Sequence, residues 1–383
     1  MTAPPERIIG LVVPPAEAWE IAPGPPARYR FPSMAASPQI RRGAALAALA
    51  ALLFGMTAPL LKRASAGAGP LLAGSLLYLG AALGAGLLAT LRRQPGGPAA
   101  TRPGALVRLA AVALVGGAIA PTLLVLGLQR TDAATASLLL ALEAPFTLAL
   151  ARLVLREFIG PRVTAAALAI VAGGVVLLGG SLGAPAALSG AVLVAAAGLA
   201  WAVDNLLSRP LAEHDPLDVV ALKGILGGAC SGAVGLALGE RVPGLRAAGA
   251  LLALGAVGYG ISLQLYLRSQ RVVGAARTAS IFASAPFFGA AIAFVFGTPW
   301  PGVAFPVAAL LVGVGLWLHL SEHHAHRHTH GPIEHEHLHR HDDGHHTHRH
   351  DPMPAGAHSH PHRHEALTHE HEHSEDLHHL HRH

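Results

Sequence analysis

Cysteine is almost absent from this sequence, since Cys230 is the single one among 383 residues. A chain with one cysteine forms no intrachain disulfide, which excludes the disulfide-stapled class of secreted proteins. Charged residues are also scarce, at 13% of the chain, whereas hydrophobic residues make up 52% and the mean hydropathy is positive. This composition is typical of an integral membrane protein.

Histidine is nearly missing from residues 1–321, because 24 of the 26 histidines fall in residues 322–383. The first part has 22 Lys and Arg against 11 Asp and Glu, and its arginines flank apolar segments instead of gathering on a soluble face. We therefore expect no nucleic-acid partner. The sequence also lacks a nucleophile with a neighbouring base, a Gly-rich phosphate loop and a Cys-rich metal site, so we expect neither an enzyme nor a required cofactor.

Apolar segments, most of 18 to 24 residues, follow one another from Gly43 onward. A helix of about 20 residues crosses the hydrocarbon core of a bilayer. Gly and Ala dominate these segments, so close backbone packing is expected to hold the helices together. The sequence predicts an all-α membrane protein with ten transmembrane helices, at 43–61, 70–91, 105–128, 133–154, 163–180, 187–207, 217–239, 247–267, 275–297 and 301–320.

The segment before the first helix is rich in proline and has no sustained apolar run. We expect residues 1–40 to be disordered and to contain neither a signal peptide nor a span. Met34 opens an ordinary start for a membrane protein, so residues 1–33 are expected to be dispensable.

One segment of the chain recurs without a gap after 141 residues. Gln129–Phe146 is QRTDAATASLLLALEAPF, and Gln270–Phe287 is QRVVGAARTASIFASAPF. Five predicted helices separate the two copies, and an odd number gives the copies opposite orientations in the membrane. This is the inverted-repeat plan of secondary transporters, with a first repeat at 41–182 and a second at 183–321.

The expected orientation follows from Lys and Arg near the helix ends, which favour the cytoplasmic side. With the N-terminus inside, 14 of these residues fall on the cytoplasmic side. Five fall on the other side, namely Lys62, Arg63, Arg130, Arg241 and Arg246. We expect a multi-pass protein of the plasma (inner) membrane with both termini in the cytoplasm.

Several segments in order resemble the drug/metabolite transporter superfamily, specifically its EamA-type members with ten helices. They are LLFGMTAPLLKR, LQRTDAATASLLLALEAPFTLALARLVLRE, GGVVLLGG, LAWAVDNLLSR and ASIFASAPFFGAAIAFVFG. The resemblance covers about residues 41–320 and implies a secondary transporter of small organic solutes, often an exporter. Glu157 matches an acidic residue common in the family after the fourth helix, whereas the second half has 297–300, GTPW, in its place. A role that needs symmetric acids is therefore in doubt.

Glu143 lies in the middle of the predicted helix 133–154, where the second copy has Ser284. A carboxyl at the bilayer centre usually faces the bundle interior or a water-filled cavity. It could exchange a proton against solute, or it could stay neutral and bond a backbone carbonyl freed by Pro145. Asp204 and Asn205 could line a cavity, or Asp204 could form a loose interfacial salt bridge with Arg209.

Further polar and helix-breaking residues are candidates for the same solute site. Tyr259 and Gln264 could orient a ligand, or they could serve as an interface anchor and an interhelical hydrogen bond. Pro59, Pro145 and Pro286 each remove one helical hydrogen bond, which exposes a carbonyl to a cavity or gives a static kink. The substrate and coupling-ion candidates are Glu143, Asp204, Asn205, Ser284, Tyr259 and Gln264.

Residues 322–383 form a histidine-rich tail in which histidine recurs at every second position. Period two places the imidazoles on one side of an extended chain, whereas a helix would scatter them. The sequence predicts a disordered cytoplasmic tail that binds Zn²⁺, Ni²⁺, Co²⁺ or Cu²⁺ in interchangeable sites, or else one that responds to pH. The candidate ligands are His326, His328, His330, His335, His337, His339, His341, His346, His348, His350, His358, His360, His362, His364, His369, His371 and His373.

Three functions remain open at this point. In the first, the bundle moves a small organic metabolite and the tail binds a divalent metal. In the second, the bundle moves the divalent metal and the tail collects it. In the third, the protein is a metal or pH sensor that transports nothing. The expected partners are the lipid bilayer, a small solute and divalent metal ions, and a homodimer is allowed.

Overall fold

The structure, a computed structural model, describes residues 38–91, 103–211 and 215–320, together with four stretches of the tail. The remaining residues, which include the Pro-rich segment 1–37, lie outside the described part. Nine helical spans of the described part are long and apolar enough to cross a membrane, at Gln39–Ala64, Pro70–Leu91, Val107–Leu128, Ala133–Leu155, Pro161–Gly180, Pro185–Leu211, Pro216–Ala237, Leu245–Val273 and Arg277–Val295. A shorter apolar helix, Ala304–His319, forms the tenth span. All ten predicted helices are therefore present.

Five of the spans are single helices, or nearly so. They are α3 (Pro70–Leu91), α8 (Pro161–Gly180), α9 (Pro185–Ser208) with η5 (Arg209–Leu211), α10 (Pro216–Ala237) and α15 (Ala304–Leu320). Proline opens α8, α9 and α10, where its missing N–H has no helical partner to lose.

The other five spans are broken into shorter pieces. The first is α1 (Pro38–Gly55) with α2 (Thr57–Ala64), and the ninth is α13 (Ala275–Phe282) with α14 (Ala285–Val295). The fourth consists of α6 (Ala133–Leu139), η3 (Leu140–Leu142), α7 (Glu143–Leu150) and η4 (Ala151–Leu155). The third consists of α4 (Pro103–Val112), η2 (Ala113–Ile119) and α5 (Ala120–Leu128), and the eighth of α11 (Leu245–Gly255), η6 (Ala256–Ile261) and α12 (Ser262–Val273).

The breaks recur in the two halves of the chain. The π-helix η2 of the third span has its counterpart in the π-helix η6 of the eighth. The fourth span changes geometry just before Glu143, and the ninth has a turn at Ala283 and Ser284, at the same point of the repeated sequence. The duplication seen in the sequence is therefore also a duplication of irregular helix geometry.

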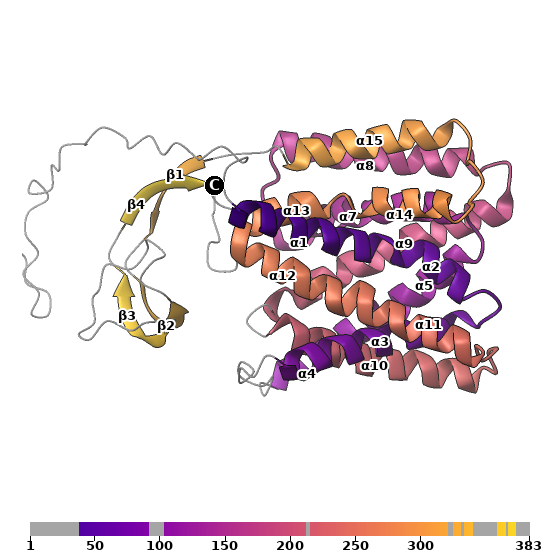
Figure 1. Cartoon of the computed structure of the whole chain (residues 1–383). Coiled ribbons are helices and arrows are strands. Elements are labelled where there is room, and N and C mark those ends of the chain that lie inside the picture. Colours follow the sequence, from indigo (N-terminus) through magenta and orange to yellow (C-terminus); the bar gives the residue numbers. More distant parts are fainter. Residues whose placement is uncertain are drawn as a thin grey trace, which may run out of the picture.

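Helices of the two halves interleave in the bundle. The first span packs through α1 on α12, α13 and α14, and the sixth span packs through α9 on α5, η2 and α7. Figure 1 shows α8 and α15 together at one edge of the bundle and α3 with α10 at the opposite edge. Each contact within this set pairs an element of one half with an element of the other.

Close helix packing depends on glycine, as expected for a membrane bundle. A Cβ added at Gly255 would lie 1.8 Å from the carbonyl oxygen of Leu77, so α11 and α3 meet backbone to backbone. The largest fully buried side chains of the described bundle are leucines and valines, such as Leu61, Leu124 and Val194.

The histidine-rich tail contains four extended strands where the sequence analysis expects disorder. They are β1 (Ala325–His330), β2 (Ile333–His339), β3 (His358–His364) and β4 (Leu367–Glu372). β1 pairs antiparallel with β4, and β2 pairs antiparallel with β3. A period of two residues is the period of a strand, so the histidine alternation is compatible with this geometry. Of the predicted ligands, His341, His346, His348, His350 and His373 lie outside the described residues.

Candidate functional site

A cavity of about 560 Å³ lies inside the bundle and receives side chains from both halves. Its wall includes residues from the middle of the fourth and ninth spans, and it continues along the sixth and tenth spans to Asn205 and His319. His319 lies at the end of α15, next to the tail. The cavity therefore extends from the bundle centre toward the end of the bundle where the tail begins.

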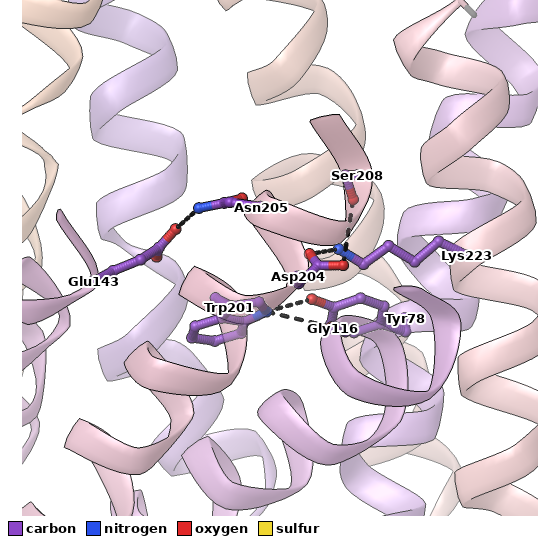
Figure 2. Close-up of polar contacts among 8 residues, drawn as sticks. All are labelled: Tyr78, Gly116, Glu143, Trp201, Asp204, Asn205, Ser208 and Lys223. Atoms are coloured by element: carbon purple, nitrogen blue, oxygen red, sulfur yellow. Dashed lines mark hydrogen bonds and ion pairs between the residues drawn. The ribbon is translucent and has the colours of Figure 1, made fainter. Parts of the chain in front are cut away.

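Glu143 lines this cavity together with Asn205. The Asn205 amide Nδ2 donates to Glu143 Oε1 over 2.9 Å, as Figure 2 shows. Glu143 is half-buried and opens α7, directly after the 3₁₀ turn η3. Among the described residues Glu143 makes no ion pair, and its carboxylate accepts a hydrogen bond from the neutral amide of Asn205.

Three carbonyl groups at this cavity lose their helical partner to proline. Proline has no N–H with which to bond the carbonyl four residues earlier. Pro59, Pro145 and Pro286 stand four residues after Gly55, Ala141 and Phe282, and all three of those earlier residues line the cavity. The breaks therefore lie beside the cavity that Glu143 lines, which is where transporter sites place broken helices.

An aromatic cluster divides the main cavity from a second one of about 290 Å³. Phe54, Tyr259, Tyr266 and Phe282 line both cavities. The ring centroids are 5.5 Å apart between Phe54 and Tyr259, 5.3 Å between Phe54 and Phe282, and 5.1 Å between Tyr266 and Phe282. Lys223 lies on the wall of the second cavity only.

Asp204 forms an ion pair with Lys223 inside the bundle, on the side of α9 away from Glu143 (Figure 2). Asp204 is 3% exposed and is absent from the walls of both cavities. The predicted salt bridge of Asp204 with Arg209 is thus wrong, because Asp204 pairs with Lys223, whereas its cavity-lining role stays a prediction. Lys223, counted in the sequence as a surface charge near a helix end, is a buried partner of this carboxylate.

Arg209 pairs instead with Glu157, which follows the fourth span. The two side chains are 29% and 20% exposed, so the pair lies near the bundle surface. The acidic residue singled out by its likeness to the family therefore has a structural contact between the fourth and sixth spans.

Trp201 connects the main cavity to the Asp204–Lys223 pair, and the sequence analysis missed it as a site residue. Its Nε1 donates to the Tyr78 hydroxyl over 2.9 Å and lies 3.3 Å from the carbonyl oxygen of Gly116. Gly116 belongs to the π-helix η2, whose local geometry exposes that carbonyl to the indole. In the sequence, Trp201 stands out only as part of LAWAVDNLLSR, one of the segments that resemble the family.

Replacement of Gly116 by alanine is expected to disturb the ion pair. A Cβ there would lie 2.2 Å from Asp204 Cγ, and the carboxylate would have to leave its position beside Lys223. We expect Gly116→Ala to lower stability in detergent by about 1–3 kcal/mol, the usual range for overpacking, measured by thermal unfolding followed through tryptophan fluorescence. Gly86→Ala is the matched control, because nothing lies within 4 Å of a Cβ at Gly86. An equal shift for both variants would contradict the packing of Asp204 against η2.

The remaining predicted site residues divide into two groups. Tyr259 lies on the wall of both cavities, and Pro286 lines the main one. Gln264 is buried and absent from both walls, and the Ser284 hydroxyl donates to the carbonyl of Ile281 over 2.6 Å without lining either cavity. The asymmetry between Glu143 and Ser284 therefore leaves one carboxyl on the cavity wall, without an equivalent from the second repeat.

At the end of the bundle opposite the tail, side chains form hydrogen bonds with backbone groups of the loops and helix ends. The Lys62 ammonium donates to the carbonyls of Leu128 and Thr131, and the Gln129 amide donates to those of Ser65 and Ala68. The Arg63 guanidinium donates to Phe296 O over 2.7 Å and lies 4.8 Å from the Phe296 ring centroid. The Glu240 carboxylate accepts from the N–H groups of Leu71 and Leu72. Lys62 and Arg63, which weaken the charge count of the sequence analysis, thus have local structural roles.

Metal-binding side chains do not gather in the bundle. Among the residues whose side chains the structure describes, no three of His, Cys, Asp and Glu are close enough to hold one ion. The main cavity contributes Glu143 and His319 of these types.

These features define a class: a multi-pass membrane bundle of two similar halves around a cavity with one carboxyl and broken helices. Comparison with known proteins identifies the family. The model of the EamA-like transporter family matches residues 41–179 and again 188–321, and the chain belongs to this family. The double match agrees with the repeat and confirms the resemblance drawn from the sequence.

Two individual matches accompany the family assignment. An uncharacterized transporter of Methanothermobacter thermautotrophicus is 30% identical over 190 residues, which cover 48% of this chain and 55% of the relative. The chain thus matches about half the length of that relative. A solved crystal structure with 23% sequence identity superimposes with a TM-score of 0.53 over 73% of this chain and 97% of that chain, a likeness that shows the fold alone.

Proposed function

We propose that this membrane transporter is a secondary transporter of a small organic metabolite, most simply an exporter, and that Glu143 exchanges a proton against the solute. The observation that carries the proposal is the contrast between the two interior carboxyls. Asp204 has Lys223 as an ionic partner, whereas Glu143 faces the cavity and has the neutral amide of Asn205. A cavity carboxyl that forms no direct ion pair among the described residues is suited to alternate between a proton and a cationic or hydrogen-bonding solute.

The arrangement of helices supports alternating access around this cavity. We propose repeats at 41–182 and 183–321 that rock against one another, as in other transporters built from inverted repeats. The cavity reaches one end of the bundle, while Lys62, Gln129, Arg63 and Glu240 tie the other end. In this interpretation the structure represents the state that is open toward the tail.

We further propose that both termini lie in the cytoplasm and that the protein resides in the plasma membrane. The count of Lys and Arg near the helix ends favours this orientation by fourteen residues to five, and Lys62 and Arg63, two of the five, have local structural roles. The state described above is then open to the cytoplasm, where an exporter loads its solute.

The tail is proposed to bind a divalent transition metal at the cytoplasmic face. Neutral imidazole suits Zn²⁺, Ni²⁺, Co²⁺ and Cu²⁺. The alternative, in which the bundle itself moves the metal, rests on the two metal-ligating side chains of the cavity, Glu143 and His319. Two such ligands are few for an ion that has lost its water, and this favours the organic solute.

Transport by purified protein in proteoliposomes tests this proposal. An imposed proton gradient is combined with a panel of labelled amino acids and related metabolites and, separately, with Zn²⁺, Ni²⁺ and Co²⁺. We expect saturable organic-solute flux that a protonophore abolishes, and the same flux in a form that ends at Ser321. Metal flux through that tail-less form, without any organic-solute flux, would overturn the proposal in favour of metal transport.

A further inference from the structure

The two strand pairs of the tail belong to one antiparallel hairpin. β1 ends with His330 opposite Leu367, and β2 begins with Ile333 opposite His364. From His330 to Ile333 is three residues, and from His364 to Leu367 is also three residues. The two ladders therefore have the same register. β1 and β2 therefore follow one another along one arm of this pairing, and β3 and β4 along the other.

This register places histidine opposite histidine. In the β2·β3 ladder the facing pairs are His335 with His362, His337 with His360, and His339 with His358. In the β1·β4 ladder they are His326 with His371, and His328 with His369. Alternate residues of a strand share one face, so all three pairs of the first ladder lie on one face, as do both pairs of the second.

Within each ladder, the face opposite its histidine pairs carries complementary charges at facing positions. Arg327 is opposite Glu370 in one ladder, and Glu334 is opposite Arg363 in the other. Oppositely charged residues at facing positions stabilise a strand pair, and like charges destabilise it. Pro361 is compatible with the ladder because both strands of a two-stranded pair are edge strands. The sequence thus favours this register on both faces.

We propose that each ladder forms one four-histidine site for a divalent transition metal, made of two neighbouring facing pairs. This inference rests on the proposed metal-binding role of the tail and replaces its interchangeable sites with two defined ones. Facing residues of an antiparallel pair have Cβ atoms about 4.5–5.5 Å apart, and neighbouring pairs on one face follow at about 7 Å, two residues of strand rise. Zn²⁺ takes four ligands in a tetrahedral set, with imidazole bonds of about 2.0–2.1 Å, and Cu²⁺ takes a tetragonal set.

Metal binding also explains how such a hairpin is held. An isolated two-stranded hairpin is marginally stable in water. An ion that binds the paired strands and not the unpaired chain stabilises the paired strands by linkage. The metal therefore supplies the stabilising free energy that a hydrophobic core would supply in a larger sheet. Zn²⁺ is therefore expected to slow amide hydrogen exchange in 325–339 and 358–372 of the full-length protein, measured by mass spectrometry in nanodiscs.

The middle pair of the β2·β3 ladder offers a decisive substitution. Loss of His337 and His360 leaves two pairs that are about 13–14 Å apart along the strands, four residues of rise, too far to share one ion. Loss of His339 and His358 removes the same number of histidines but keeps two neighbouring pairs. We compare His337→Gln/His360→Gln with His339→Gln/His358→Gln in the full-length protein.

The measurement is Zn²⁺ binding in competition with a chromophoric chelator. We expect two tight sites in the unaltered chain and in the outer-pair variant, and one in the middle-pair variant, whose second site weakens at least about tenfold. If both variants lose the same Zn²⁺ affinity and still bind Zn²⁺, the sites are not defined by the strand register. The proposed metal-binding function of the tail would still hold. If the full-length chain binds no Zn²⁺ saturably, both the sites and that function are refuted.

Discussion

Proteoliposomes that carry Glu143→Gln are expected to lose proton-driven solute accumulation while they keep solute counterflow. Glutamine preserves the size of the side chain and a carbonyl oxygen that accepts from the Asn205 amide, which donates to Glu143 over 2.9 Å. It cannot, however, take up or release a proton. Removal of a positioned proton-transfer group typically slows a reaction about 10²–10⁴-fold, and we expect coupled accumulation to fall by about 100-fold or more.

The pH profile separates this role from a purely structural one. Coupled flux through the unaltered protein should vary with pH on the cavity side, whereas counterflow through Glu143→Gln should be flat over the same range. Glu157→Gln is the matched control, since Glu157 is a carboxyl outside both cavities that pairs with Arg209. Unchanged coupling in Glu143→Gln would end the proton-exchange proposal, and equal loss in Glu157→Gln would point to a general effect of carboxyl removal.

Substitution of Lys223 by methionine is expected to have the largest effect on stability. It leaves Asp204 charged, 3% exposed and without its cation. Removal of one partner of a buried pair destabilises a protein by about 3–5 kcal/mol, whereas exchange of both partners for apolar residues is often neutral. We therefore expect Lys223→Met to unfold at a markedly lower temperature in detergent, and Lys223→Met/Asp204→Leu to recover most of the loss.

Arg209→Met gives the comparison with a more exposed pair. The Arg209 and Glu157 side chains are 29% and 20% exposed, and solvent-exposed pairs contribute about 0–1 kcal/mol. In thermal unfolding followed by tryptophan fluorescence, Lys223→Met should therefore unfold at a clearly lower temperature than Arg209→Met. If the two variants unfold at the same temperature, or the double variant is no better than Lys223→Met, the pair at Asp204 is not the buried ionic contact described here.

The helices and their duplication could be predicted from the sequence because both are local signals. Runs of about 20 apolar residues mark spans one at a time, and the repeated Ala-Pro-Phe around Pro145 and Pro286 marks equivalent points in two of them. Glu143 stood out for the same reason, since a lone carboxyl in an apolar run is conspicuous. Its place on the cavity wall agrees with that expectation.

Partners across the bundle could not be predicted in the same way. Asp204 and Lys223 lie on different helices, and the charge-count rule treats every lysine near a helix end as a surface signal. From the sequence, Arg209 was the expected ion-pair partner of Asp204 because it is nearby in the chain. The packing of the helices places Lys223 beside Asp204 instead. The contact of Trp201 with Gly116 depends on a π-helix whose presence no residue pattern announces.

The interleaving of the two halves has a consequence for how the protein is made. The first span leaves the ribosome at Pro38, but a principal packing partner, α12, begins at Ser262. Until the eighth span has been inserted, one face of α1 has only lipid or an insertion factor beside it. The two repeats, although similar in sequence, therefore mature as one unit, and a nascent chain that stops between them holds an incomplete half-bundle with no finished cavity.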